Sequence, residues 1–251
     1  MTKYNLKKMT NVLIIVCIFF TVRATFWIYG MQTDDVFQGD TLKELYMLGL
    51  SDGYFGTLEQ TLVGTILLII AMEYMLGKDE SNFLIRYSSR SDYLCVRIEM
   101  AISVGIGIVI CKFLIGIIFL WYEFGNDLIF TMATGRFVIT GVLVYSFFSI
   151  RCGIVYLIFR DLLNKRGVAM GITVMIYFLE FYIWLDNLLH PLVTVRWMPF
   201  LDLSAAADIY AGQISLYGLL LAGIRQVGLT TICLLIWMQI WKRKDVMNLE
   251  K

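Results

Sequence analysis

Three charged side chains lie inside long apolar runs of the sequence, where an isolated charge is unfavourable. Counted at 1.5 Å per residue, Lys112, Glu180 and Arg225 each lie roughly 9–14 Å from the end of their run that we place outside the cell. Because a charge at such depth in a membrane is costly, we expect these side chains to face the protein interior and pair with one another. Three roles stay open: an ion-pair network that joins helices, a place on a substrate path, or extension to the membrane surface.

Four further charges lie closer to the ends of the apolar runs. Arg23 and Glu59 lie near the outer boundary, and Glu99 and Arg151 lie nearer the inner half. We expect most of these side chains to reach the membrane interface, where water can solvate the charge.

A second group of candidate residues lies in the segment 77–97, which reads GKDESNFLIRYSSRSDYLCVR. Acidic residues at its start favour a helix, since they interact with the positive end of the helix dipole. At helical spacing, Phe83, Tyr87 and Leu94 share one face, and the arginines lie on the adjoining flank. The pattern predicts a helix in the headgroup plane that presents arginines to the cytoplasm. A basic surface helix without a partner is the alternative.

The motifs of covalent catalysis and of cofactor binding are absent from the sequence. It has no GxxxxGK[ST] nucleotide loop, no HExxH pair and no GxSxG nucleophile elbow with a histidine partner. A single histidine, His190, and five cysteines without a CxxC pair argue against a metal site or a disulfide framework. We therefore expect a protein that is not an enzyme, with no catalytic, cofactor-binding or metal-binding residues and no nucleic-acid partner.

Membrane-spanning helices must position these residues. Hydrophobic residues make up 59% of the 251 residues and charged residues 16%, and the charges cluster between long apolar runs. A spanning helix needs about 20 mainly apolar residues. The sequence predicts an all-α membrane protein with one transmembrane domain, residues 1–251, and six transmembrane helices at 9–29, 58–76, 95–120, 137–159, 167–186 and 216–241.

The distribution of basic residues predicts the orientation. Six helices place both termini on one side, and fourteen of the 21 Lys and Arg residues lie on that side. Positively charged loops are retained in the cytoplasm, so we expect both termini to be cytoplasmic.

One outer segment, residues 187–215, is too apolar for an ordinary solvated loop. It contains both prolines of the chain, Pro191 and Pro199. Irregular backbone at membrane depth is tolerated only against protein or a water-filled cavity. The segment therefore predicts short re-entrant helices between the fifth and sixth spans, packed against protein.

Small residues recur at four-residue spacing in two of the spans. This spacing marks close approach between helices, either within one chain or between two chains. The pairs are Gly167/Gly171, Ala101/Gly105 and Ser103/Gly107.

The topology and one motif resemble those of ABC-2-type transporter permease subunits. The resemblance covers the whole chain: six spans, cytoplasmic ends, a surface helix between spans two and three, and a re-entrant outer segment between spans five and six. The motif NFLIRYSSRSDYL is similar to a stretch common in small bacterial permeases of this group, particularly those that export bacteriocins or lantibiotics or give immunity to them.

This resemblance implies a function and a set of partners. The chain would be the permease of an ATP-binding-cassette exporter in the bacterial plasma membrane, moving a bacteriocin-like peptide or another amphipathic cargo. A second permease, identical or homologous, and two copies of a separate ATPase carrying Mg-ATP would complete the transporter in membrane lipid. The loop Arg160–Arg166 and the N-terminal tail would be weaker candidates for ATPase contact. The ATPase-coupling helix would contain Phe83, Arg86, Tyr87, Ser89, Arg90 and Tyr93.

Two other functions stay open. One is a non-transport assembly or immunity factor that binds a peptide or lipid, and the other is a secondary transporter. Secondary transporters often use spans broken by Gly or Pro, and the predicted spans contain no proline. A gene for a Walker-type ATPase beside the gene for this chain would separate these functions.

Overall fold

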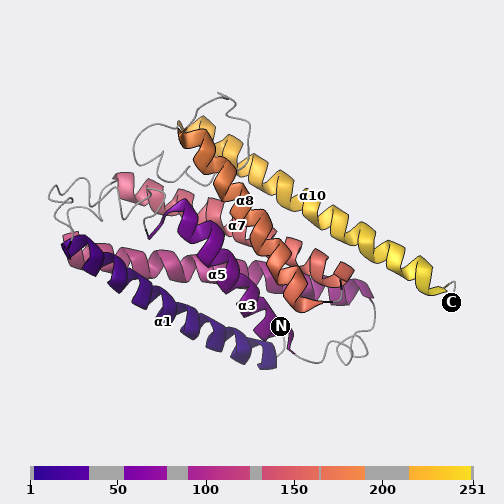
Figure 1. Ribbon diagram of the computed structural model, residues 1–251. Helices are drawn as coiled ribbons and strands as arrows, with labels where there is room; N and C mark the ends of the chain where they lie inside the picture. The colour runs from indigo at the N-terminus through magenta and orange to yellow at the C-terminus, as the bar shows by residue number, and fades with distance from the viewer. Residues whose placement is uncertain are drawn as a thin grey trace.

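The regular structure of the described residues is entirely helical (Figure 1). The computed structural model describes residues 3–33, 54–77, 90–124, 132–163, 165–189 and 215–249. In chain order the elements are α1 (Lys3–Thr33), the π-helix η2 (Glu59–Gly64), α3 (Thr65–Leu76), α5 (Arg90–Phe124), α7 (Met132–Leu163), α8 (Arg166–Leu189) and α10 (Leu216–Leu249). The all-α prediction is confirmed for this part of the chain.

Six helical segments among the described residues are long and apolar enough to cross a membrane. They run over Leu6–Trp27, Glu59–Leu76, Asp92–Tyr122, Thr134–Leu163, Arg166–Ile183 and Tyr217–Trp241. The six spans predicted from the apolar runs are confirmed by this measure. Their number and composition indicate a transmembrane protein.

In the described residues five helices, α1, α5, α7, α8 and α10, extend further than their apolar runs, and two of these extensions carry buried side chains. α5 begins at Arg90 rather than at residue 95, and α7 continues to Leu163 rather than ending at residue 159. The added turns carry Tyr93 and Arg160, which are 5% and 3% exposed. Buried polar and aromatic side chains extend the helices, because tertiary packing stabilises a turn that hydropathy does not identify.

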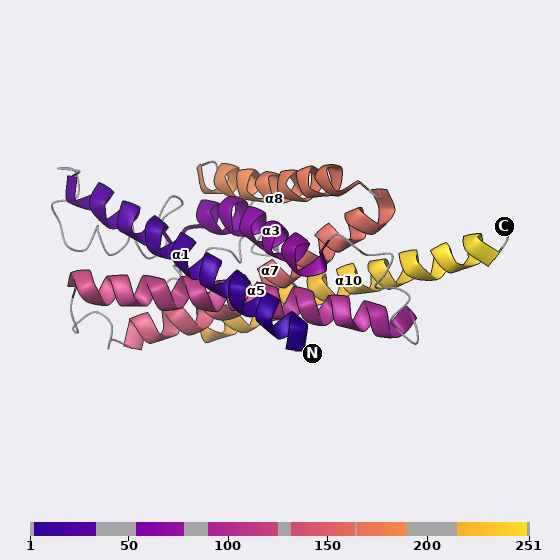
Figure 2. The same cartoon turned by 90° about the horizontal axis from the view of Figure 1, so that it is seen from below.

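The centre of the bundle is formed by η2, α3, α5 and α7 (Figures 1 and 2). α5 and α7 pack along each other, α1 covers α5 and α3, and α8 packs on α7 and η2. α10 packs mainly along α7. The outward faces of the peripheral helices are apolar: Ile18 and Phe26 of α1 and Ile224 of α10 are each at least 60% exposed. Such faces suit a hydrocarbon solvent.

Glycines allow the central helices to approach closely. A Cβ atom at Gly105 of α5 would lie 3.2 Å from the backbone nitrogen of Ile150 in α7, and one at Gly107 would lie 2.9 Å from Leu13 of α1. The spacing seen in the sequence thus serves helix contacts within the chain at these two positions. Gly167 and Gly171 of α8, in contrast, have no neighbouring atom within 4 Å of an added Cβ.

The first and last helices have their outer ends on the same side of the bundle. The first turn of α1 and the last turn of α10 point toward the same end of the molecule, although in both views the N-terminus lies near the middle of its length and the C-terminus at the far end (Figures 1 and 2). We call this end the terminus end, and the other the opposite end. Near the terminus end, α3 stops at Gly77, whose φ of +75° favours glycine. Of the segment 187–215, for which short re-entrant helices were predicted, residues 187–189 belong to α8, whereas residues 190–214 lie outside the described residues, as do residues 78–89.

Candidate functional site

One buried ion pair joins α7 to α8. Arg151 Nη2 donates to Glu180 Oε1 at 2.7 Å, and both side chains are largely buried. The Arg151 guanidinium carbon also lies 5.3 Å from the ring centre of Phe148 and 5.6 Å from that of Tyr177. These rings add cation–π attraction and shield the pair from lipid. Arg151, which we expected to reach the interface, is instead a core residue.

Glu180 therefore has a different partner from the one that the sequence predicted. The prediction compared depths counted from the ends of apolar runs and favoured Lys112 or Arg225. α7 has 32 residues and α8 has 24, so the ends of the two helices are not level, and equal counts do not give equal heights. Arg225 lies half-buried on α10.

Lys112 lies in a separate polar cluster toward the opposite end. Its side chain is 1% exposed, and its Nζ donates to Gln60 Oε1 at 3.2 Å. Gln60 Nε2 in turn donates to Ser149 Oγ at 3.1 Å, which links α5, η2 and α7. The Lys112 ammonium also lies 5.3 Å from the ring centre of Tyr145. The expected pairing of Lys112 with Glu180 is not present.

The π-helix η2 makes this arrangement possible. It directs two successive residues to different helices: Gln60 toward Lys112 of α5, and Glu59 toward Arg23 of α1. Glu59 accepts from Arg23 Nε at 3.1 Å and from Nη2 at 2.6 Å, and is 4% exposed. Arg23 and Glu59, which we expected near the outer boundary, thus form a two-bond ion pair, and the Arg23 side chain remains 34% exposed. π-helical turns are rare and frequent at functional sites.

At the terminus end, one carboxylate joins three helices. Asp161 of α7 accepts from Arg97 Nη1 of α5 at 2.7 and 3.0 Å. Its Oδ2 also accepts from Trp237 Nε1 at 2.7 Å and from Trp241 Nε1 at 2.9 Å, both from α10. Tyr93 completes what we call the Asp161 cluster, because its ring centre lies 5.8 Å from that of Trp241.

Tyr93 lies in a different environment from the one that the sequence predicted. We placed it on a surface helix, whereas it is buried in the first turn of α5. Arg90 is the first residue of α5. The other residues assigned to the coupling helix lie outside the described residues: Phe83, Arg86, Tyr87 and Ser89. Their role stays a prediction.

A second carboxylate at the terminus end, Glu73 of α3, binds the end of α7. It accepts a short hydrogen bond from the Tyr156 hydroxyl and forms ion pairs with Arg160 at 3.0 Å and with Arg166 at 3.8 Å. Arg160 points inward, whereas the Arg166 side chain is 47% exposed. Of the loop Arg160–Arg166, Arg166 is thus better placed than Arg160 to meet a partner.

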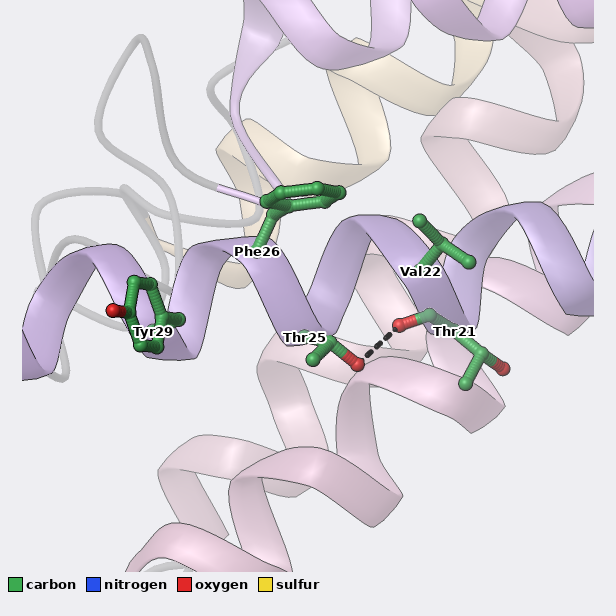
Figure 3. A pocket seen from close by; sticks show the side chains of 5 residues that line it. All are labelled: Thr21, Val22, Thr25, Phe26 and Tyr29. Carbon is green, nitrogen blue, oxygen red and sulfur yellow. Dashed lines mark hydrogen bonds between the residues drawn. The ribbon is translucent and has the colours of Figure 1, made fainter.

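The surface depression in Figure 3 does not enter the bundle. It has a volume of about 270 Å³ and is lined by five residues of α1: Thr21, Val22, Thr25, Phe26 and Tyr29. The Thr25 hydroxyl donates to the Thr21 carbonyl at 2.9 Å, so it is already used within the helix. Among the described residues, no group of three or more His, Cys, Asp or Glu side chains could hold a metal ion.

Comparisons with protein-family models, with curated proteins and with solved structures gave no match to this chain. The fold and its buried charges define a helical membrane protein whose interior contains ionisable side chains at several depths. Ionisable residues inside spanning helices commonly mark transport or signalling sites, which makes these clusters the candidate functional site.

Proposed function

We propose that this chain is the membrane-spanning subunit of an ATP-driven exporter of the bacterial plasma membrane. It works with a second permease, identical or homologous, and with two copies of a separate ATPase that binds Mg-ATP. The cargo is a peptide or another amphipathic molecule. The chain itself hydrolyses nothing and supplies the path.

One observation carries the proposal. The basic segment that resembles an ATPase-coupling region leads directly into α5, and the start of α5 is fixed to α7 and α10 through Arg97 and Asp161. A force applied to residues 78–89 therefore acts on a helix that runs the length of the bundle. A surface helix that only rests on lipid needs no such buried connection.

The interior charges suit a protein that changes conformation. Arg151–Glu180 and Arg23–Glu59 each join two helices, and the first pair joins the central α7 to the peripheral α8. Buried ion pairs give direction to helix packing more than net stability. We infer that these pairs fix the resting arrangement of the helices, and that cargo moves between two permease copies.

The test uses the gene neighbourhood and a charge reversal. Any Walker-type ATPase encoded beside the gene for this chain is co-expressed with it, and the purified complex is assayed for ATP hydrolysis in lipid nanodiscs. We expect Arg86→Glu with Arg90→Glu to release the ATPase or to abolish its stimulation by the chain. The control reverses two charges elsewhere on the same side, Arg243→Glu with Lys244→Glu, and should leave the stimulation unchanged.

Three results would count against the proposal. The absence of a neighbouring ATPase gene would favour an assembly or immunity factor. Cargo uptake that follows an ion gradient without ATP would favour a secondary transporter. A complex that stays intact and fully active with both arginines reversed would reduce the 77–97 segment to a membrane-surface helix.

A further inference from the structure

The Asp161 cluster is the direct connection between α5 and α10. α10 packs mainly along α7, and its backbone scarcely approaches that of α5. Side chains of α5 and α10 meet in this cluster: Tyr93 lies against Trp241, and the Arg97 guanidinium lies 5.5 Å from the ring centre of Trp237. Both tryptophans also donate to the same Asp161 oxygen.

The hydrogen bonds of the Asp161 cluster couple α5 to α10 through one shared carboxylate. A carboxylate accepts hydrogen bonds only, and here it receives donors from α5 on one side and from α10 on the other. Arg97 is held between two rings, 5.3 Å from the ring centre of Tyr93 as well as close to Trp237. A shift of the first turns of α5 would therefore break bonds to Asp161 unless α10 moved with it.

We propose that Asp161 is a positioning residue that transmits displacement of the segment before α5 to α10. This inference rests on the proposed function and names the joint through which ATPase movement reaches a peripheral helix. α10 follows α5 because its two indoles share the carboxylate that Arg97 holds. Without this joint, the main connection that remains between α5 and α10 in the described residues is the packing of each helix on α7.

Two variants test whether the hydrogen bonds to Asp161, and not general packing, couple α5 to α10. Trp237→Phe with Trp241→Phe retains an aromatic ring at each position and removes the two Nε1 donors, together with part of the bulk of each indole. Asp161→Asn removes the charge but leaves a side chain of the same size. The control is Tyr156→Phe, which retains the ring and removes one hydrogen bond to a carboxylate at the same end, Glu73 of α3.

Two measurements are made on the nanodisc complex of the chain with its neighbouring ATPase. The first is ATPase stimulation by the chain. The second is the distance between spin labels on Cys95 and on a cysteine at Gln239, both exposed, with the other four cysteines replaced. In the parent protein we expect one narrow distance distribution that is the same with and without trapped nucleotide.

In both cluster variants we expect the distance distribution to broaden on nucleotide trapping and the stimulation to fall about tenfold, the effect of losing one hydrogen bond to a charged group. The control should keep both properties of the parent protein. Stimulation within about twofold of the parent, in both cluster variants, would overturn the inference. An equal loss in Tyr156→Phe would overturn it as well, by showing general loosening. If the parent chain does not stimulate the ATPase, the proposed function fails, and the inference fails with it.

Discussion

The Arg151–Glu180 pair allows a sharp test of how charges are held inside this bundle. Replacing Glu180 by Gln leaves a guanidinium that stays charged among the rings of Phe148 and Tyr177. Breaking a buried pair in this way costs about 3–5 kcal/mol. For a chain of this size, roughly 2–4 °C of melting temperature corresponds to each kcal/mol. We therefore expect Glu180→Gln to lower the melting temperature in detergent by about 6–20 °C.

The opposite single change should be milder. In Arg151→Met the remaining carboxylate can take up a proton and become neutral, so less charge is stranded. The double change should recover most of the stability, because an apolar side chain and an amide replace both ions. The assay is intrinsic tryptophan fluorescence during heating. Arg136→Met is the matched control, since Arg136 lies exposed on the same helix, and it should not shift the transition.

The refuting result is additivity. If the two single losses simply sum in the double variant, within about 0.5 kcal/mol, the two residues do not interact and the 2.7 Å contact carries no energy. Rescue of Glu180→Gln by a change at Lys112 or Arg225 instead would restore the network that the sequence predicted and would show that Arg151 is not the partner.

Three further predictions concern packing, the lysine cluster and topology. Gly105→Ala should destabilise the protein by about 1–3 kcal/mol, because the new methyl group meets the α7 backbone at 3.2 Å. Gly171→Ala, which has open space around the new methyl group, should be neutral or slightly stabilising. Equal melting temperatures of the two variants would contradict this prediction. Lys112→Met should change stability by less than about 2 kcal/mol, since the lysine binds an amide and not a carboxylate; a larger loss on heating would reveal an ion pair. An impermeant thiol reagent added to intact cells should label a cysteine at Asn126 and not one at Ser88, and the reverse result would invert the orientation.

The spans could be predicted from the sequence because they depend on composition alone. About 20 apolar residues are needed wherever the helix lies in the bundle, so six runs give six helices. The tilt of a helix, and the length by which it extends beyond its apolar run, leave no such pattern in the sequence. That is why Glu180 could be identified as a buried charge, whereas its partner Arg151 was assigned to the interface.

The other missed features depend on neighbours from distant parts of the chain. The amphipathic pattern around Tyr93 fits a helix on lipid as well as a helix against α10, because both surroundings are apolar. The π-helical turn at Glu59 has no periodicity of its own, since it adds one residue to a helix. The spacing of Trp237 and Trp241 does place both indoles on one face of α10, and that signal could have indicated a shared acceptor.

The spanning helices differ in length, and a flat bilayer of one thickness cannot match all of them. The apolar segments of α5 and α7 have 31 and 30 residues, whereas those of η2–α3 and α8 have 18 each. At 1.5 Å per residue the long pair reaches about 45 Å and the short pair about 27 Å, against roughly 30 Å of hydrocarbon. The long helices must tilt or project, while the lipid beside exposed α8 must thin. Acyl-chain length should therefore change the shape of this protein, and its heat stability should peak in bilayers somewhat thinner than average.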